Sequence, residues 1–329
     1  MQPTDPAKVS VAIPTYNGAR HLSEALQSIL AQGESYPIVV SDDRSDDGTL
    51  EIIQAVAGDR VRSFINTERL GLAGNWNRCV ELTPSPFVAI VHQDDFLRPG
   101  HIASHAAAIS RDPGVGLIAS ASRTIDDSDN EVPAAVVDRG GLGSHDLMFG
   151  AGDALRAIAT ANPFRCSGVT INVAAHAELG GFDPAWRYLV DWDYWLRVAR
   201  NYRVAWLAEP TVDVRWHAAS ETHRFARGTI DLEETTRLLD KVYAAESSRW
   251  PDAADLRRRA DHRLARAYLN RAHVALRAGD GDLARRALRR SLAMKPTLLG
   301  PILLDPRLAV QVAAIAVAPR WAARVFKRP

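Results

Sequence analysis

The chain has 329 residues, of which 47% are hydrophobic and 24% are charged, and its formal net charge is +1. This composition is typical of a globular protein with one large domain and a smaller addition. Its two cysteines, Cys79 and Cys166, exclude a disulfide framework and a zinc cluster of cysteines, and they indicate a reducing compartment. The first residues lack the basic and apolar segments of a signal peptide, and the longest apolar run, Leu308–Ala318, is shorter than the about 20 residues that span a bilayer. We therefore expect a cytoplasmic protein.

The small net charge hides an asymmetry along the chain. Residues 240–329 contain 19 lysines and arginines but only eight aspartates and glutamates, a net charge of +11, so the preceding residues carry −10. Helical periodicity also dominates from about residue 232 onward. We therefore predict two domains, an acidic α/β domain at 1–231 and a basic α-helical extension at 232–329.

The first ~120 residues alternate between short apolar runs and segments with helical periodicity. We expect strands at 8–13, 36–41, 60–66, 86–91 and 114–122. We expect helices at 19–31, 47–57, 73–82 and 98–110. Continuous apolar strands separated by helices predict a doubly wound, Rossmann-like, mostly parallel sheet that is covered on both faces.

Polar clusters follow three of these strands. They are Thr15-Tyr16-Asn17, Asp42-Asp43 and Asp94-Asp95. The carboxyl ends of parallel strands lie at one edge of a sheet, where ligands bind, so we expect the three clusters to face a common site. The alternative is that Asp42 and Asp94 only cap the helices that follow them.

This edge has no glycine-rich phosphate loop, because neither G-x-G-x-x-G after the first strand nor G-x-x-x-x-G-K-[ST] occurs. An acidic edge accepts a phosphate only through a divalent cation, and carboxylates are hard oxygen ligands suited to Mg²⁺ or Mn²⁺. The pair Asp94-Asp95 therefore predicts a metal ion that carries a diphosphate.

Five segments match one known family in the same order, over roughly residues 8–220. They are VSVAIPTYNGARHLSEALQSILAQ, IVVSDDRSDDGT, NTERLGLAGNWNRCVEL, VHQDD and GGFDPAWRYLVDWDYWLRVA. Together they resemble the family 2 glycosyltransferases, which have the GT-A fold. The resemblance implies an enzyme of cell-envelope polysaccharide biosynthesis that transfers a sugar from a nucleotide diphosphate sugar to an acceptor hydroxyl. Such transfer usually inverts the anomeric carbon and uses Mn²⁺ or Mg²⁺.

The resemblance also assigns the nucleotide-binding residues. It implies that Pro14, Tyr16 and Asn17 form the first loop that contacts the nucleotide. It further implies that Asp43 hydrogen-bonds the base and that Asn75 faces the donor.

The metal motif departs from the commoner D-x-D-D form, because His92 stands where the first Asp is expected. By resemblance, Asp94 and Asp95 contact the metal and the ribose, and which of them holds the metal directly stays open. His217 resembles a later histidine of the family that completes the metal site, and its alternative is an ordinary solvent-facing or core histidine.

An inverting transfer needs a base that takes the proton of the acceptor hydroxyl. The family pattern Glu-Asp-x-Asp is here Val190-Asp191-Trp192-Asp193, so Asp191 matches the base although Val190 replaces the Glu. We expect Asp193 and Arg197 to form an ordinary helical i,i+4 ion pair.

Two further regions flank this block. Five of the eight tryptophans lie between residues 186 and 216, and we expect most of them in the core, with one or two beside the acceptor. The stretch 122–165 is rich in turn residues and weakly periodic, which predicts a long irregular loop on the acceptor side.

The extension contains DHRLARAYLNRAHVALRAGDGDLARRALRRSLAMKP, which resembles one tetratricopeptide-like helix pair hinged at Gly279-Asp280-Gly281. A single pair cannot bury both faces, so we expect it to pack on the body or on a partner. The final PRWAARVFKRP mixes aromatic and basic residues, which suits peripheral association with an anionic membrane. The alternative is a solvated basic helix. Nucleic acid is not expected, since no recognition motif accompanies the charge.

The leading hypothesis is a metal-dependent inverting glycosyltransferase whose acceptor is a cell-surface glycan or a lipid-linked saccharide. Two alternatives remain. A nucleotidyltransferase acting on sugar phosphates would favour a glycine-rich basic loop after the first strand, and PTYNGARH is not one. A catalytically inactive GT-A scaffold would not need to retain Asp43, Asp94, Asp95 and Asp191.

Overall fold

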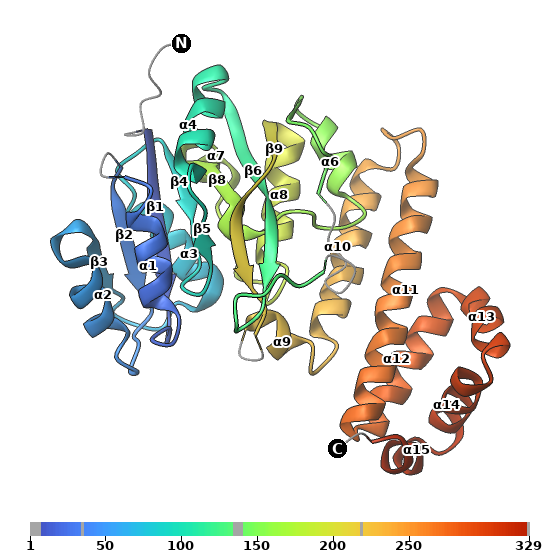
Figure 1. Cartoon of the computed structure of the whole chain (residues 1–329). Helices are drawn as coiled ribbons and strands as arrows, with labels where there is room; N and C mark the ends of the chain where they lie inside the picture. Colours follow the sequence, from blue (N-terminus) through green and yellow to red (C-terminus); the bar gives the residue numbers. More distant parts are fainter. Residues whose placement is uncertain (1–7, 34–35, 134–140, 218–219, 328–329) are drawn as a thin grey trace. The chain divides into compact units, whose positions relative to one another are not determined.

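Figure 1 shows the computed structural model, which describes residues 8–33, 36–133, 141–217 and 220–327. The chain forms two compact units. Unit 1 comprises Met1–Ile158 and Asn162–His217, and unit 2 comprises Ala159–Ala161 and Ala218–Pro329. The domain boundary expected between residues 231 and 232 falls inside the helix α10 (Ile230–Glu246) and stays a prediction.

Unit 1 is built on one nine-stranded sheet with the order β3-β2-β1-β4-β8-β6-β9-β5, and β7 pairs with β9. The strands are β1 (Val9–Thr15), β2 (Ile38–Asp42), β3 (Arg62–Ile65), β4 (Phe87–Ile90), β5 (Phe96–Leu97), β6 (Val115–Ile125), β7 (Leu147–Phe149), β8 (Val169–Asn172) and β9 (Arg203–Arg215). The pairings β1–β2, β1–β4, β2–β3 and β6–β9 are parallel. The strand β8 lies between β4 and β6 and runs antiparallel to both, so β4 and β6 point the same way.

The predicted α/β class with a mostly parallel sheet is confirmed, but the sequence prediction missed the short strand β5 and the long strand β9, and it differs in two further regions. The sequence did not predict β8, a four-residue strand with no periodic pattern of its own. The prediction of one irregular loop over 122–165 was wrong in three places: β6 continues to Ile125, β7 pairs with β9, and a short helix, α6, covers Asp153–Ile158. Residues 134–140 of this stretch lie outside the described residues.

Helices connect and cover the strands of unit 1 (Figure 1). Besides α6 they are α1 (Leu22–Leu30), α2 (Thr49–Ala57), α3 (Gly71–Glu81), α4 (His101–Arg111), α7 (Val173–Leu179) and α8 (Val190–Asn201). Short 3₁₀ turns cover Gly58–Arg60 (η2) and Cys166–Gly168 (η3).

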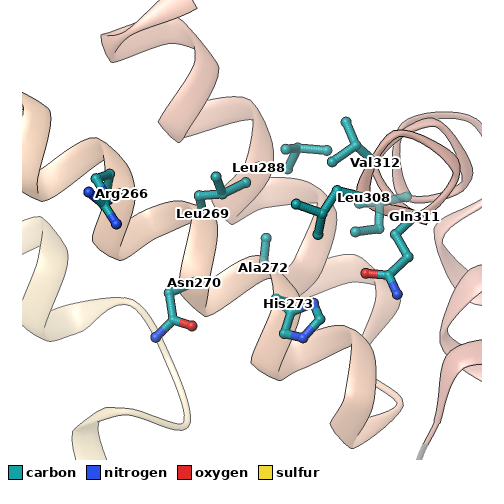
Figure 2. A pocket seen from close by; sticks show the side chains of 10 residues that line it. Arg266, Leu269, Asn270, Ala272, His273, Leu288, Leu308, Gln311 and Val312 are labelled. Atoms are coloured by element: carbon teal, nitrogen blue, oxygen red, sulfur yellow. The ribbon is translucent and has the colours of Figure 1, made fainter. Parts of the chain in front are cut away.

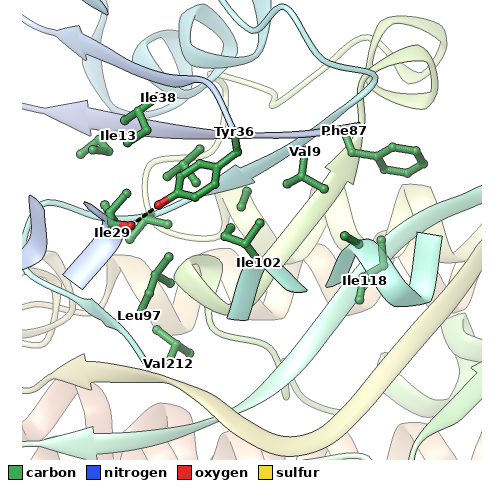
Figure 3. Close-up of a cluster of buried hydrophobic side chains, with 14 of the residues drawn as sticks. Val9, Ile13, Ile29, Tyr36, Ile38, Phe87, Leu97, Ile102, Ile118 and Val212 are labelled. Carbon is green, nitrogen blue, oxygen red and sulfur yellow. Dashed lines mark hydrogen bonds between the residues drawn. The ribbon is translucent and has the colours of Figure 1, made fainter. Parts of the chain in front are cut away.

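The main core lies between the sheet and the helices that follow β1 and β5. All seven residues of β1 are buried, so both of its faces are covered. Its alternate residues Val9, Val11 and Ile13 belong to the same apolar cluster as Leu26 of α1 and Ile102 of α4 (Figure 3). The Tyr36 hydroxyl lies within this cluster and donates a hydrogen bond to the backbone oxygen of Ile29 (Figure 3).

Unit 2 is helical. Its helices are α9 (Glu221–Phe225), α10, α11 (Ala253–Ala278), α12 (Gly281–Met294), α13 (Leu299–Leu304), α14 (Pro306–Val317) and α15 (Pro319–Phe326), with a 3₁₀ turn, η4, at Pro296–Leu298. Gly279 ends α11 with φ +87°, a left-handed conformation that favours glycine, and the Asp280 side chain accepts a hydrogen bond from Leu283 N at 2.8 Å to begin α12.

The helices α11 and α12 stand where the sequence resembles a tetratricopeptide-like pair, and they pack against each other. Other helices of unit 2 pack on this pair: α10 and α15 pack on α11, and α14 and α15 pack on α12. A bidentate ion pair joins α10 to α11, with Arg271 Nη1 and Nη2 lying 3.0 and 2.7 Å from the two carboxylate oxygens of Asp231.

A pocket of ≈ 270 Å³ lies between α11, α12 and α14 (Figure 2). Its lining is mainly aliphatic with a few polar side chains, namely Arg266, Leu269, Asn270, Ala272, His273, Leu288, Leu308, Gln311, Val312 and Ile315. No helix within the described residues is long and apolar enough to cross a membrane.

Because their burial differs, we expect two isoleucines of the same sheet to contribute differently to the free energy of unfolding. Ile13 on β1 is fully buried, whereas Ile65 on β3 is 59% exposed. We expect Ile13→Ala to lower the free energy of unfolding by about 2–5 kcal/mol, because it removes buried methyl groups and leaves a cavity. The control Ile65→Ala should cost less than about 1 kcal/mol. Denaturant titrations that give equal losses for both variants would contradict this account of the core.

Candidate active site

The ends of β1 and β2 are tied together by buried polar groups. Thr15 Oγ1 donates to Asp42 Oδ2 at 2.8 Å, and Asp42 Oδ1 accepts from Ser45 N at 2.8 Å. Asp42 therefore holds the loop that precedes α2, which agrees with a structural role for this carboxylate.

Asp43 is buried at the start of α3. Its carboxylate accepts from Leu70 N at 2.7 Å and from Gly71 N at 2.9 Å, and the Asn66 side chain donates a third hydrogen bond at 3.1 Å. A carboxylate at this position is favoured by the positive end of the helix. Asp43 thus fixes α3 against β2, and its contact with a base stays a prediction.

Asn75 on α3 is also buried. Its Nδ2 group donates to Ser41 O at 3.0 Å and to Thr15 O at 3.3 Å, and its Oδ1 accepts from Asn66 at 3.0 Å. Both amide hydrogens are thus used to hold the ends of β1 and β2. The expected contact of Asn75 with the donor stays a prediction.

The loop after β1 exposes two of the predicted nucleotide contacts. Tyr16 and Asn17 are exposed, whereas Pro14 is buried inside β1. The Arg69 guanidinium lies 3.4 Å from the centroid of the Tyr16 ring, and such stacking orients the ring. Asn17 has φ +48°, and its side chain accepts from Asp46 N at 3.0 Å.

Gln93 fastens this loop to the end of β4. Its Oε1 accepts from Tyr16 N at 2.9 Å, and its Nε2 donates to Tyr16 O at 3.0 Å. A Cβ atom at Gly18 would lie 2.2 Å from Gln93 Oε1, so a larger residue at this position would displace the Gln93 side chain. The sequence analysis missed Gln93, although its place directly before Asp94 was a signal.

Asp94 and His217 meet at the ends of β4 and β9, as the resemblance implied. His217 Nε2 lies 2.9 Å from Asp94 Oδ2, and the Asp94 side chain is partly exposed whereas His217 is 8% exposed. Burial acts to raise the pKa of Asp94, but the hydrogen bond from His217 and the nearby His92 outweigh it and lower that pKa. The pair therefore combines an ionised carboxylate with an imidazole that it orients.

Asp95, in contrast, points into the protein. Its Oδ2 accepts from Ser167 Oγ at 2.5 Å, and its Oδ1 accepts from the backbone N of Arg215 at 3.0 Å. Burial raises the pKa of Asp95 to about 6, and the charge of Asp94 adds to this shift. Asp95 thereby joins β4 to η3 and β9.

His92 lies beside this pair, where the family pattern has an Asp. Its ring packs 5.1 Å from that of Trp76, and its Nδ1 is 3.9 Å from Asp95 Oδ2. One ligand atom from each of His92, Asp94 and Asp95 lies within 4.8 Å of the others, a spacing that a metal ion could bridge.

Asp191 lies in the first turn of α8. Its Oδ2 accepts from Asn162 Nδ2 at 3.0 Å, and its Oδ1 accepts from Trp192 N at 2.6 Å. Burial raises the pKa of the Cys166 thiol, and the negative charges of Asp191 and Asp95 raise it further. The sequence analysis did not identify Asn162 or Ser167, which hold these two carboxylates.

Two expectations about the same block are confirmed. Asp193 accepts from Arg197 Nε at 2.8 Å, the i,i+4 ion pair expected for a structural role. Most of the clustered tryptophans are buried core residues, namely Trp186, Trp192, Trp195 and Trp206.

A curled, mostly parallel α/β sheet with polar and acidic strand ends defines the class of GT-A glycosyltransferases, and known structures agree. A mannosyltransferase from Pyrobaculum calidifontis, solved in complex with GDP-Man and Mn²⁺, superposes with a TM-score of 0.54 at 20% identity. The superposition covers 98% of this chain and 88% of that one. At this identity the likeness establishes the fold.

Sequence comparisons identify the family. The pattern of the family described as Glycosyl transferase family 2 matches residues 10–170. An uncharacterized protein of Mycobacterium tuberculosis, MT1568, is 30% identical over 258 residues, which cover 71% of this chain and 76% of that protein. The chain belongs to glycosyltransferase family 2 and is a glycosyltransferase that acts with a nucleotide sugar.

A relative with a described activity matches over a shorter length. The GalNAc(5)-diNAcBac-PP-undecaprenol beta-1,3-glucosyltransferase of Campylobacter jejuni is 34% identical over 101 residues. The match covers 30% of this chain and 33% of that protein, so only part of the catalytic domain is compared.

Proposed function

We propose that this glycosyltransferase is metal-dependent and inverting, and that it transfers a sugar from a nucleotide diphosphate sugar to a hydroxyl of a cell-surface glycan or lipid-linked saccharide. The observation that carries the proposal is the 2.9 Å contact between Asp94 and His217 at the ends of β4 and β9. It gives the acidic edge of the sheet a mixed oxygen and nitrogen ligand set.

The two adjacent carboxylates have different surroundings, which supports different roles. Both oxygens of Asp95 already accept hydrogen bonds, from Ser167 and Arg215, whereas Asp94 is partly exposed and faces His217. We therefore assign direct metal binding to Asp94 and His217, and we assign to Asp95 the positioning of that pair. Carboxylate and imidazole ligands together fit Mn²⁺, and the P. calidifontis mannosyltransferase, solved with GDP-Man and Mn²⁺, makes a nucleotide sugar and Mn²⁺ suitable probes.

In the proposed reaction Asp191 acts as the general base. It accepts the proton of the acceptor hydroxyl while the oxygen forms a bond to the anomeric carbon, and the bond from that carbon to the diphosphate breaks from the opposite side. A bound divalent ion would neutralise the charge that develops on the departing diphosphate. The Asn162 amide and the backbone N–H of Trp192 keep the Asp191 carboxylate oriented at the start of α8.

The metal assignment is tested with Asp94→Asn. This variant keeps the size of the side chain but removes its charge, so we expect metal-dependent affinity for the nucleoside diphosphate to fall by at least about a hundredfold. Calorimetric titration with a panel of nucleoside diphosphates, with Mn²⁺ or with chelator, measures the effect. The exposed control Asp59→Asn should bind as the wild type does. If the wild type binds nucleoside diphosphates equally well with and without chelator, nucleotide binding is not metal-dependent and the proposal is wrong on this point.

The base assignment is tested with Asp191→Asn. We expect transfer to fall by at least about a hundredfold while nucleotide affinity changes only a few-fold, because the variant loses basicity and keeps its hydrogen bonds. Asp193→Asn, two positions along α8, breaks the ion pair with Arg197 and should lower thermal stability more than turnover. Near-normal transfer by Asp191→Asn would make Asp191 structural.

The proposed acceptor is consistent with peripheral association with an anionic membrane through unit 2. We define the C-terminal surface as the exposed apolar and basic side chains of α13, α14 and α15. They are Leu299, Leu304, Arg307, Leu308, Val310, Val317, Arg320, Trp321, Arg324 and Val325, and we include Lys327, which directly follows α15. Trp321 and Val325 are one helical turn apart on α15, next to Arg320 and Arg324, so apolar and cationic groups share one face. Each cation near an anionic surface contributes on the order of 1 kcal/mol, which salt weakens.

This association is tested with the double variant Trp321→Ser, Val325→Ser. Trp321 is 58% exposed, and burying one such side chain in the interface contributes about 1.5–3 kcal/mol. We therefore expect binding to anionic vesicles to weaken at least about tenfold in co-sedimentation. Val274→Ser on α11, at an equally exposed valine outside the C-terminal surface, is the matched control. If the double variant and the wild type sediment alike, the C-terminal surface does not bind membranes.

A further inference from the structure

A second group of potential metal ligands includes His217 but not Asp94, Asp95 or His92. It consists of His21 directly before α1, Asp127 after β6 and His217 after β9. One ligand atom from each lies within 4.8 Å of the other two. His21 and His217 have ring centroids 5.1 Å apart, and His21 Nε2 is 3.7 Å from Asp127 Oδ1.

Two ring nitrogens in this group are buried without a hydrogen-bond partner in the described part of the chain. They are His21 Nε2 and His217 Nδ1. An unpaired buried polar atom is costly, and a bound ion is one of its ordinary explanations. The other nitrogen of His217 faces Asp94 Oδ2 at 2.9 Å. A histidine that ligates a metal usually donates its second N–H to a carboxylate in this way.

The two arginines beside the group form ion pairs with carboxylates. The Asp127 Oδ2 atom is 3.2 Å from Arg20, which leaves Oδ1 on the side of His21. The nearby Arg215 guanidinium is paired with Asp129 at 2.7 Å and with Glu24 at 3.4 Å. A cation at the group would therefore meet one carboxylate oxygen and two imidazoles, and the two guanidinium groups beside it, those of Arg20 and Arg215, are each paired with carboxylates.

We propose that His21, Asp127 and His217 form a binding site for Zn²⁺, separate from the ion that Asp94 and His217 hold in catalysis. Imidazole and carboxylate ligands suit Zn²⁺, and three protein ligands with an open fourth position are a common zinc arrangement. Ligands about 2.0–2.2 Å from a tetrahedral ion lie roughly 3.3–3.6 Å apart, which is close to the 3.7 Å between His21 Nε2 and Asp127 Oδ1.

The two metal sites exclude each other because they share one imidazole. A neutral imidazole has a single lone pair, so His217 binds Zn²⁺ through Nδ1 only while Nε2 carries the proton that Asp94 accepts. When Nε2 binds the catalytic ion instead, the proton must reside on Nδ1. Zinc therefore removes a ligand from the catalytic site, and it inhibits transfer. Only this inhibitory consequence rests on the proposed function.

Zinc binding is measured on the full chain without nucleotide or acceptor, by competition with a chromophoric chelator. We expect one Zn²⁺ per chain, and we expect Co²⁺ in its place to give the visible absorption of a tetrahedral site. His21→Phe and Asp127→Asn should each weaken zinc binding by at least about a hundredfold. Asp59→Asn, an exposed carboxylate in η2 that takes no part in the group, is the control and should bind zinc within a few-fold of the wild type.

A second comparison separates this site from the catalytic one. Asp94→Asn should lose Mn²⁺-dependent nucleotide binding but keep zinc binding, because the Asn carbonyl still accepts the His217 N–H. Zinc should inhibit transfer by the wild type and should not inhibit transfer by the Asp127→Asn variant. Because the Asp127 side chain is exposed, we expect this variant to fold as the wild type does. The proposal is overturned if the wild type takes up no zinc at about 10 µM free metal. It is also overturned if zinc binding survives His21→Phe and disappears in Asp94→Asn. Neither result depends on whether the chain transfers sugar.

Discussion

The site depends on one buried carboxylate that joins three distant parts of the chain. Asp95 accepts hydrogen bonds from Ser167 and from the backbone of Arg215, which places η3 and the end of β9 against the end of β4. A buried carboxylate must be satisfied in this way, because an unpaired charge in the interior is very costly. His217 follows Arg215 by two residues, so the same contact that satisfies Asp95 also delivers the imidazole to Asp94.

Much of the fold was predictable, because β1, β2 and β4 are buried on both faces and so appear as continuous apolar runs. The strand ends could be placed at one edge for the same reason, since parallel pairing aligns their carboxyl ends. The ion pair of Asp193 with Arg197 followed from helical spacing alone. The local sequence pattern was therefore enough to predict the buried strands and the ion pair within one helix.

The remaining features depend on contacts between segments that no local pattern relates. The strand β8 has four residues and gains its place only by pairing with β4 and β6. Asp43 and Asn75 have the sequence context of ligand-facing residues, yet their hydrogen bonds hold α3 against β1 and β2. His21 is unremarkable in sequence, and only folding brings it beside His217, 196 positions along the chain. Contacts between residues so far apart in the sequence are set by the tertiary structure, and so the sequence pattern did not predict them.

The Gln93 amide pairs with the backbone of Tyr16 as a neighbouring strand would, through one donated and one accepted hydrogen bond. Gln93 is covalently adjacent to Asp94, so the loop assigned to the nucleotide and the carboxylate assigned to the ion share a rigid connection. Two ligands whose sites are joined in this way change each other's affinity by the same factor. In the proposed enzyme, the dependence of nucleotide binding on the ion therefore equals the dependence of ion binding on the nucleotide, whichever of them arrives first.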